Sequence, residues 1–126
     1  MKRSDILDKA KKRKKELGLT IDNISRLSNL GHKAVASFFV GDDVGLSTLE
    51  KISDILGIDF AGNEIVDIQT LKEHRAKQKA LEIVSLVQDT SSLEMQGLEE
   101  KQIQLLVNET KEEFLTGQYS KYLWVN

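Results

Sequence analysis

Histidine, cysteine and carboxylate side chains carry most enzyme chemistry, and this chain offers few of them in useful arrangements. Its 126 residues include two histidines, His32 and His74, and no cysteine. The lack of cysteine excludes disulfides, thiol nucleophiles and zinc sites with thiolate ligands. Neither histidine has a carboxylate or a second histidine at the spacing of metal ligands. We therefore expect no catalytic residue, no metal and no cofactor.

Other acidic and glycine-containing motifs also lack the partners that chemistry needs. The loop Gly41–Gly45 contains two aspartates but not the further ligands of a calcium-binding motif. The pairs Glu99-Glu100 and Glu112-Glu113 fall in predicted helices, where solvation explains them. No glycine-rich phosphate loop follows a predicted strand. The sequence predicts a binding protein and not an enzyme.

Basic side chains are the more informative group, because they are unevenly distributed. The net charge is -2, yet residues 1–40 carry ten Lys and Arg against four acidic residues. Residues 60–126 carry seven basic and eleven acidic side chains. A basic run from Lys9 to Lys15 suits the phosphates of DNA, with Lys12 and Arg13 as expected contacts, although a solvated helix face would explain the same charges.

Apolar periodicity broken by Gly and Asn predicts an all-α chain, because no period-2 alternation is sustained. The first helix is expected over Ser4–Leu17, with Ser4 as N-cap and Gly18 as a left-handed stop. Thr20 is expected to cap the second helix. Further helices are predicted near residues 31–40, 47–56, 69–92 and 99–115.

The helix predicted near residues 47–56 has a recognisable start and a recognisable buried face. Ser47 is followed three residues later by Glu50, a spacing that predicts a capping box. Four apolar residues at 3–3–4 spacing are expected to share the buried face: Leu46, Leu49, Ile52 and Leu56. Gly57 is expected to close the helix.

The chain has no segment that could cross a membrane by its composition. No apolar run approaches about 18 residues, and Met1–Leu30 has no hydrophobic signal-peptide region. We expect a cytoplasmic protein without membrane contact, associated with the nucleoid if it binds DNA.

The segment Thr20–Gly41 has the features that a helix-turn-helix requires. Ser25 is small enough for two helices to approach closely, and Asn29 tolerates the positive φ of the turn. Apolar residues at suitable offsets would point inward from both helices and the turn: Ile24, Leu27, Leu30, Val35 and Phe38.

These residues resemble the lambda-repressor-like, Xre-type helix-turn-helix family over about residues 4–59. The matching pieces include Gly18-Leu19-Thr20, Ser28-Asn29-Leu30 and the closing helix that ends in Leu56-Gly57-Ile58. The resemblance implies a helix-turn-helix bundle whose third helix, near residues 32–39, lies in the major groove of double-stranded DNA as part of a homodimer. The residues expected to contact DNA there and on the second helix are Thr20, Arg26, Gly31, His32, Lys33, Ala36 and Ser37.

The second half of the chain is not needed for such a bundle. We expect a DNA-binding domain over residues 1–59, a connector over 60–68, and a two-helix extension over 69–126 that dimerises or binds a partner. The alternative is that these helices only pack on the first bundle. The aromatic tail is either a clasp over its own core or a recognition segment. The expected interface residues are Leu81, Val84, Val87, Phe114, Tyr119, Tyr122 and Trp124.

The extension from Leu81 to Glu94, followed by a helix and a Trp-containing tail, looks like that of some Xre-type antitoxins. This resemblance implies a repressor of its own operon that also sequesters a toxin protein. The sequence thus predicts a sequence-specific transcriptional regulator. The alternative is an antitoxin that captures a co-encoded toxin with little or no DNA binding, as Ile21, Ser37, Asp42 and Asp43 depart from the family pattern.

Overall fold

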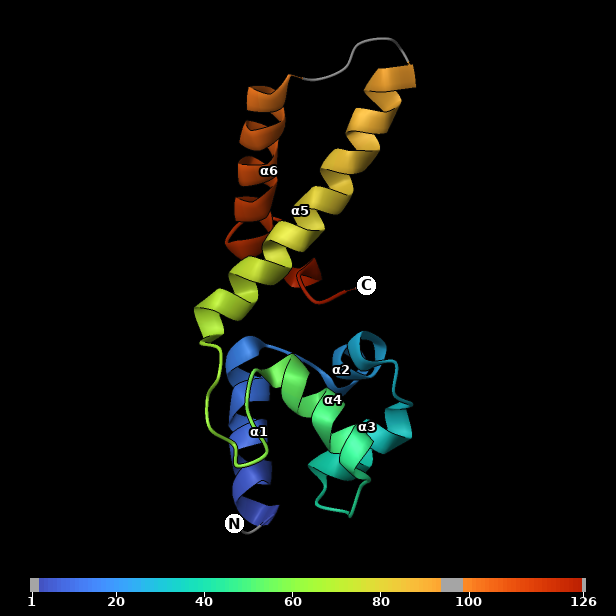
Figure 1. Cartoon of the computed structure of the whole chain (residues 1–126), viewed down its shortest axis with the longest axis vertical. Helices are drawn as coiled ribbons and strands as arrows, with labels where there is room; N and C mark the ends of the chain where they lie inside the picture. The colour runs from blue at the N-terminus through green and yellow to red at the C-terminus, as the bar shows by residue number, and fades with distance from the viewer. Residues whose placement is uncertain (1–2, 94–98, 126) are drawn as a thin grey trace. The chain divides into compact units, whose positions relative to one another are not determined.

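The computed structural model describes residues 3–93 and 99–125, and within them the regular structure is helical. A single isolated bridge pairs Ile58 with Glu64. The prediction of an all-α fold is confirmed for these residues. The elements are α1 (Arg3–Leu17), α2 (Ile21–Ser28), α3 (His32–Phe39), α4 (Leu46–Leu56), α5 (Ile68–Leu93), α6 (Glu100–Leu115) and the 3-10 helix η1 (Ser120–Tyr122) (Figure 1).

The chain forms two compact units. The first comprises Met1–Leu71 and Trp124–Asn126, and the second Lys72–Leu123. The first unit extends past the expected boundary at residue 59 because Ile68 and Leu71 pack against its core. Trp124 joins the same core, and its indole Nε1 donates a hydrogen bond to the Leu17 carbonyl at 2.9 Å. Of the two roles considered for the tail, Trp124 therefore takes that of a clasp.

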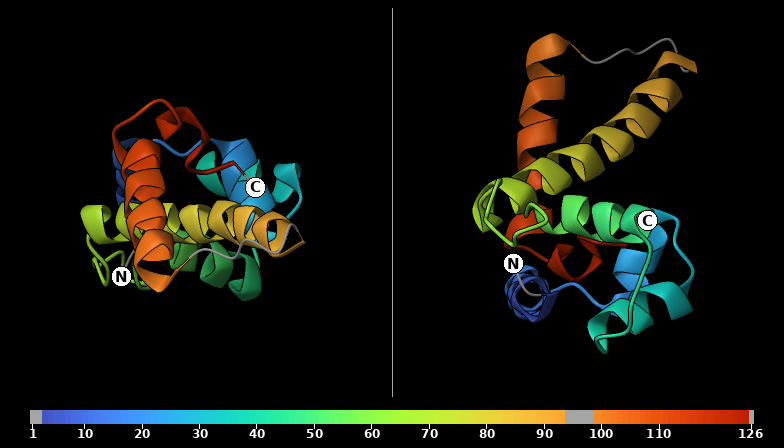
Figure 2. Two further views of the ribbon diagram at one scale, coloured as in Figure 1. Left: turned by 90° about the horizontal axis from the view of Figure 1, so that it is seen from above. Right: turned by 60° about the horizontal axis from the view of Figure 1, so that its bottom comes forward.

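The core of the first unit draws on all four of its helices. Ile6, Ala10 and Leu17 of α1 are buried, as their spacing predicted. They pack with a group of buried apolar residues from the other helices, namely Ile24, Val35, Phe38, Phe39, Ile52 and Leu56. Figure 2 shows the helices of this unit from two further sides. The core thus fixes α3 through one face only.

Most of the predicted helix ends are confirmed. Gly18 and Gly57 adopt left-handed backbone conformations, with φ of 75° and 68°. Thr20 caps α2, because its Oγ1 accepts a hydrogen bond from the Asn23 N–H at 3.0 Å, and its own N–H donates to Asn23 Oδ1 at 3.0 Å. The predicted N-cap Ser4 is wrong, because α1 begins at Arg3 and Ser4 lies inside it.

The start of α4 also differs from the prediction. Gly45 is the N-cap and Ser47 lies within the helix, so the predicted capping box of Ser47 and Glu50 is wrong. The Leu49 N–H bonds to the Gly45 carbonyl at 3.1 Å, which starts the helix two residues earlier than expected. Leu46 occupies the first turn and is 67% exposed, so its expected place on the buried face is wrong.

The turn between α2 and α3 depends on Asn29. It is the one non-glycine residue with positive φ in the described chain, at 59°, and it closes α2 in the left-handed conformation that its residue type predicted. We predict that Asn29→Ala lowers the free energy of unfolding by about 1 kcal/mol, because a Cβ without a polar group disfavours this conformation. Asn29→Gly should match the wild type in urea denaturation. Equal losses in both variants would contradict this role.

Asp67 directly precedes α5, and this position changes the pKa of its carboxylate. It accepts a hydrogen bond from the Thr70 N–H at 2.6 Å. Hydrogen bonds from the Thr70 side chain and backbone lower the pKa of Asp67 below its ordinary value of 3.8. The amide of Asn63 acts in the same direction on the pKa of Asp59, whose carboxylate closes the loop before α5.

Because the pKa values of Asp59 and Asp67 are lowered, we predict that the first unit loses stability in acid. A carboxyl whose pKa is lower in the folded than in the unfolded state stabilises the fold above the unfolded value and loses this effect as the pH falls through the folded value. We expect the urea midpoint to fall when the pH drops from about 6 to about 3. Asp67→Asn should show a smaller fall, and an unchanged pH dependence in this variant would contradict the role of Asp67.

The second unit is built around the crossing of α5 and α6, which run in opposite directions (Figure 1). Ala80 and Val84 of α5 are buried against Val107 of α6, with Ile103 and Leu106 at the edge. Arg75 Nε donates to the Leu123 carbonyl at 2.9 Å, which holds the end of the unit against the beginning of α5. Burial lowers the pKa of Arg75 below its ordinary value.

Candidate nucleic-acid interface

The connection between α2 and α3 is held by side-chain hydrogen bonds. Ser25 Oγ donates to the Leu30 carbonyl at 2.6 Å. Ser28 Oγ donates to the Ile24 carbonyl at 2.6 Å and accepts from the Leu30 N–H at 3.3 Å. The backbone groups of a left-handed turn are thereby satisfied without solvent. The turn therefore sets the direction in which α3 leaves α2.

α3 divides into a core face and a solvent face. Val35, Phe38 and Phe39 are buried. On the other side the expected DNA contacts Gly31, His32 and Lys33 are exposed, and the helix contains no acidic residue.

Ala36 and Ser37, also expected to contact DNA, are half-buried on the sides of α3. Both side chains are small, so the helix backbone is close to the surface along this stretch. A helix with such a face can approach base-pair edges closely in a groove about 12 Å wide.

The two expected contacts around α2 have different surroundings. Thr20 is exposed, and because its Oγ1 is the acceptor of the cap, its hydroxyl proton is available to an external acceptor. Arg26 is exposed and pairs through Nε with the Asp22 carboxylate at 3.0 Å, one turn away on the helix. A phosphate would therefore compete with Asp22 for this guanidinium.

Arg13 was expected to contact DNA, and the structure corrects this. Its side chain lies on the same stripe of α1 as Ile6, Ala10 and Leu17, and the residue is only 7% exposed. The guanidinium donates to the Leu56 carbonyl at 3.0 Å, to the Val66 carbonyl and to the Glu64 carboxylate. Arg13 therefore joins α1 to the end of α4 and the segment beyond it, and its donors are occupied inside the protein.

The same region explains why residue 57 is glycine. A Cβ at Gly57, which also has positive φ, would lie 2.8 Å from Leu71 Cδ1 and 3.1 Å from Arg13 Nη2. The backbone of Gly57 thus lies close to the guanidinium that anchors the segment. The sequence does contain a signal for the burial of Arg13. Ala10, Arg13 and Leu17 follow one another at i, i+3 and i+7, so Arg13 belongs to the apolar stripe of α1.

The remaining lysines of α1 are divided between its two flanks. Leu7 lies beside Gly41 and Lys14 lies over the Phe39 ring at 5.9 Å, so this flank faces α3. Lys11 belongs to the same row of the helix and is exposed. On the other flank the side chain of Lys9 lies against the backbone of Gly62. Lys12 lines a cavity of about 280 Å³ together with Glu16 and Glu64.

Comparisons with models of protein families, with curated proteins and with solved structures found no match. The function of the chain is therefore inferred from its own residues. In the described ranges no group of three or more His, Asp or Glu residues could hold a metal ion. No helix there is long and apolar enough to span a membrane.

The expected partner-binding residues of the second half differ in exposure. Val84 and Phe114 are buried within the second unit, so they serve its own packing in this structure. Leu81, Tyr119 and Tyr122 are exposed. Val87 lies on α5, and its side chain falls outside the described residues. Leu105 of α6 was not among the expected interface residues, yet its side chain is 60% exposed.

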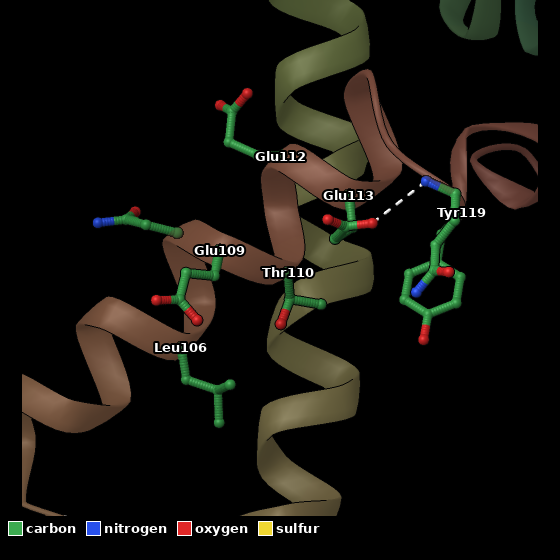
Figure 3. A pocket seen from close by; sticks show the side chains of 8 residues that line it. Leu106, Glu109, Thr110, Glu112, Glu113 and Tyr119 are labelled. Carbon is green, nitrogen blue, oxygen red and sulfur yellow. Dashed lines mark hydrogen bonds between the residues drawn. The ribbon is translucent and has the colours of Figure 1, made fainter.

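The C-terminal part of α6 borders a hollow of about 670 Å³ (Figure 3). Three glutamates line it, namely Glu109, Glu112 and Glu113, and Tyr119 stands at its edge with its ring 5.5 Å from that of Phe114. The Glu113 carboxylate accepts a hydrogen bond from the Gln118 N–H at 3.1 Å. This local negative surface repels phosphates.

Proposed function

We propose that the protein is a sequence-specific DNA-binding transcriptional regulator that inserts α3 into the major groove as a lambda-repressor-like helix-turn-helix. One observation carries the proposal: α3 has a solvent face with His32 and Lys33, no acidic residue, and a rigid connection to α2. Such a face matches the shape and charge of the groove. The resemblance of residues 4–59 to Xre-type regulators supports the same function.

Two exposed aspartates, Asp42 and Asp43, follow α3 after a bend of the chain. Gly41, with φ of 94°, bends the chain before Asp42 is reached. The Asp42 N–H bonds back to the Ser37 carbonyl at 3.0 Å, which turns the segment around the end of the helix. The acidic residues therefore follow the last turn of α3, and none stands within the helix itself.

In this proposal the phosphate contacts come from Lys11 on α1 and Thr20 at the start of α2. Lys11 is placed on the flank of α1 that faces α3, whereas Lys12, the earlier expectation, is on the other flank.

We predict that Lys11→Ala weakens binding to every DNA sequence alike. It should reduce the slope of log K against log salt by about 1 per subunit. Binding titrations over a range of salt concentrations measure this slope. Lys12→Ala is the matched control and should leave the slope unchanged; a larger effect from Lys12 would contradict the assignment.

We further infer that the protein acts as a homodimer and that the second unit supplies the contact. The observation that favours this is the set of exposed apolar side chains on α5 and α6, which includes Leu81, Ile83 and Leu105. Two helices crossing once cannot bury both of their faces, and isologous pairing with a second copy would do so. Light scattering should give twice the chain mass, and Leu81→Gln with Leu105→Gln should give the monomer.

Selection from a random duplex library tests the proposed function. A dimer should enrich a two-fold symmetric sequence with half-site centres about 34 Å, one helical turn, apart or a multiple of that distance. Failure to enrich any sequence would overturn the proposal. It would favour the second candidate, a protein-capture function of the exposed apolar residues on the second unit, such as that of an antitoxin.

A further inference from the structure

The solvent face of α3 continues past the lysine into apolar side chains. Lys33, Ser37 and Val40 follow one another at spacings of four and three, so they lie in one row, with Ala36 beside it. Val40 is 73% exposed, the highest value among the exposed large hydrophobic residues of the described chain. The core does not account for this valine, because Phe38 and Phe39 fill the space beneath the end of the helix.

The major groove presents one apolar group on its base edges, the C5 methyl of thymine. An ammonium group is a donor only, and the adjacent acceptors O6 and N7 of guanine are its commonest match in the groove. The row on α3 therefore combines a donor at its N-terminal end with apolar contacts along the side and at the C-terminal end. The eight residues from Lys33 to Val40 are separated by seven helical rises, or about 10 Å, which corresponds to about three base-pair steps.

From this arrangement we infer the base composition of the half-site, an inference that rests on the proposed function. Thymine methyl groups lie against Ala36 and Val40, and a guanine lies opposite Lys33, all within about four consecutive base pairs. Val40 and Ala36 are specificity-determining residues through methyl contact alone. The small side chains of Ala36 and Ser37 allow the helix to come close enough for these contacts.

The test replaces thymine by deoxyuridine, which removes the C5 methyl and keeps every hydrogen-bonding group of the base. The duplex enriched by selection is the probe, and each thymine of the half-site is replaced in turn. Loss of a methyl contact should weaken binding of the wild type about fourfold at the position facing Val40. At that position, Val40→Ala should bind the thymine and deoxyuridine duplexes equally.

Leu46→Ala is the matched control, because Leu46 is another strongly exposed apolar residue but stands outside the row on α3. It should keep the fourfold sensitivity to deoxyuridine. Circular dichroism verifies that both variants are folded, which is expected because neither side chain is part of the core. Sequence-selective binding that is insensitive to deoxyuridine at every position would overturn this inference and leave the proposed function standing. Absence of DNA binding by the folded wild type would overturn both.

Discussion

Replacing Arg13 by alanine is expected to destabilise the first unit by about 2 to 4 kcal/mol. The substitution removes a buried guanidinium and leaves the carbonyl oxygens of Leu56 and Val66 without their donor. Arg13→Lys should recover little of this loss, because an ammonium group cannot reproduce the fork of donors that reaches two carbonyls and Glu64.

Urea denaturation followed by tryptophan fluorescence measures this effect. Trp124 is the only tryptophan of the chain and packs against the core of the first unit, so its emission reports on that unit. The neighbouring variant Lys12→Ala, on the exposed side of the same helix, should change the free energy of unfolding by no more than about 0.5 kcal/mol. Similar stabilities of the Arg13 and Lys12 variants would show that the guanidinium does not hold the fold.

Lys33→Ala is expected to weaken binding to the selected operator by about 1 to 3 kcal/mol, or roughly 5- to 150-fold. The side chain is exposed on α3 and has no role in the core, so the loss reflects contact with bases. Binding to a random duplex should change far less, by about the value of one phosphate charge.

Parallel titrations of the variant against the operator and against the random duplex separate these two effects. Lys11→Ala provides the comparison, because a phosphate contact should weaken both complexes to the same degree. Equal losses on both duplexes for Lys33→Ala would remove this residue from base recognition and with it the assignment of α3 as the recognition helix.

Local features of the fold were predictable from the sequence. Gly18, Asn29 and Gly57 marked helix ends because few residue types tolerate positive φ, and all three adopt it. The apolar stripe of α1 and the inward residues of α2 and α3 followed from helical spacing. These signals depend on neighbours within one or two turns, which is the range over which sequence patterns carry information.

Features that depend on distant contacts were not predictable in the same way. Arg13 lies in a run of lysines, and its burial depends on carbonyls 43 and 53 residues further along the chain. Trp124 bonds to a carbonyl 107 residues away. Nothing in the spacing of a single segment specifies such partners. An arginine within an apolar helical stripe does indicate that this arginine stabilises the fold.

The start of α4 shows a competition between local signals. Ser47 with Glu50 favoured one N-cap, yet the helix begins at Leu46 with Gly45 as N-cap. Glycine is an acceptable N-cap, and moving the start of the helix by two residues costs little. Leu46 is exposed as a result and does not join the core.

The central claim is that the first unit recognises a DNA sequence, and one titration tests it most directly. Fluorescence anisotropy would compare the duplex upstream of the protein's own gene with a random duplex of equal length, both at about 150 mM salt, where non-specific phosphate contacts are weakened. We expect tight binding to the upstream duplex and binding to the random duplex that is weaker by at least about a thousandfold. Equal affinity for both duplexes, or no binding to either, would contradict the claim.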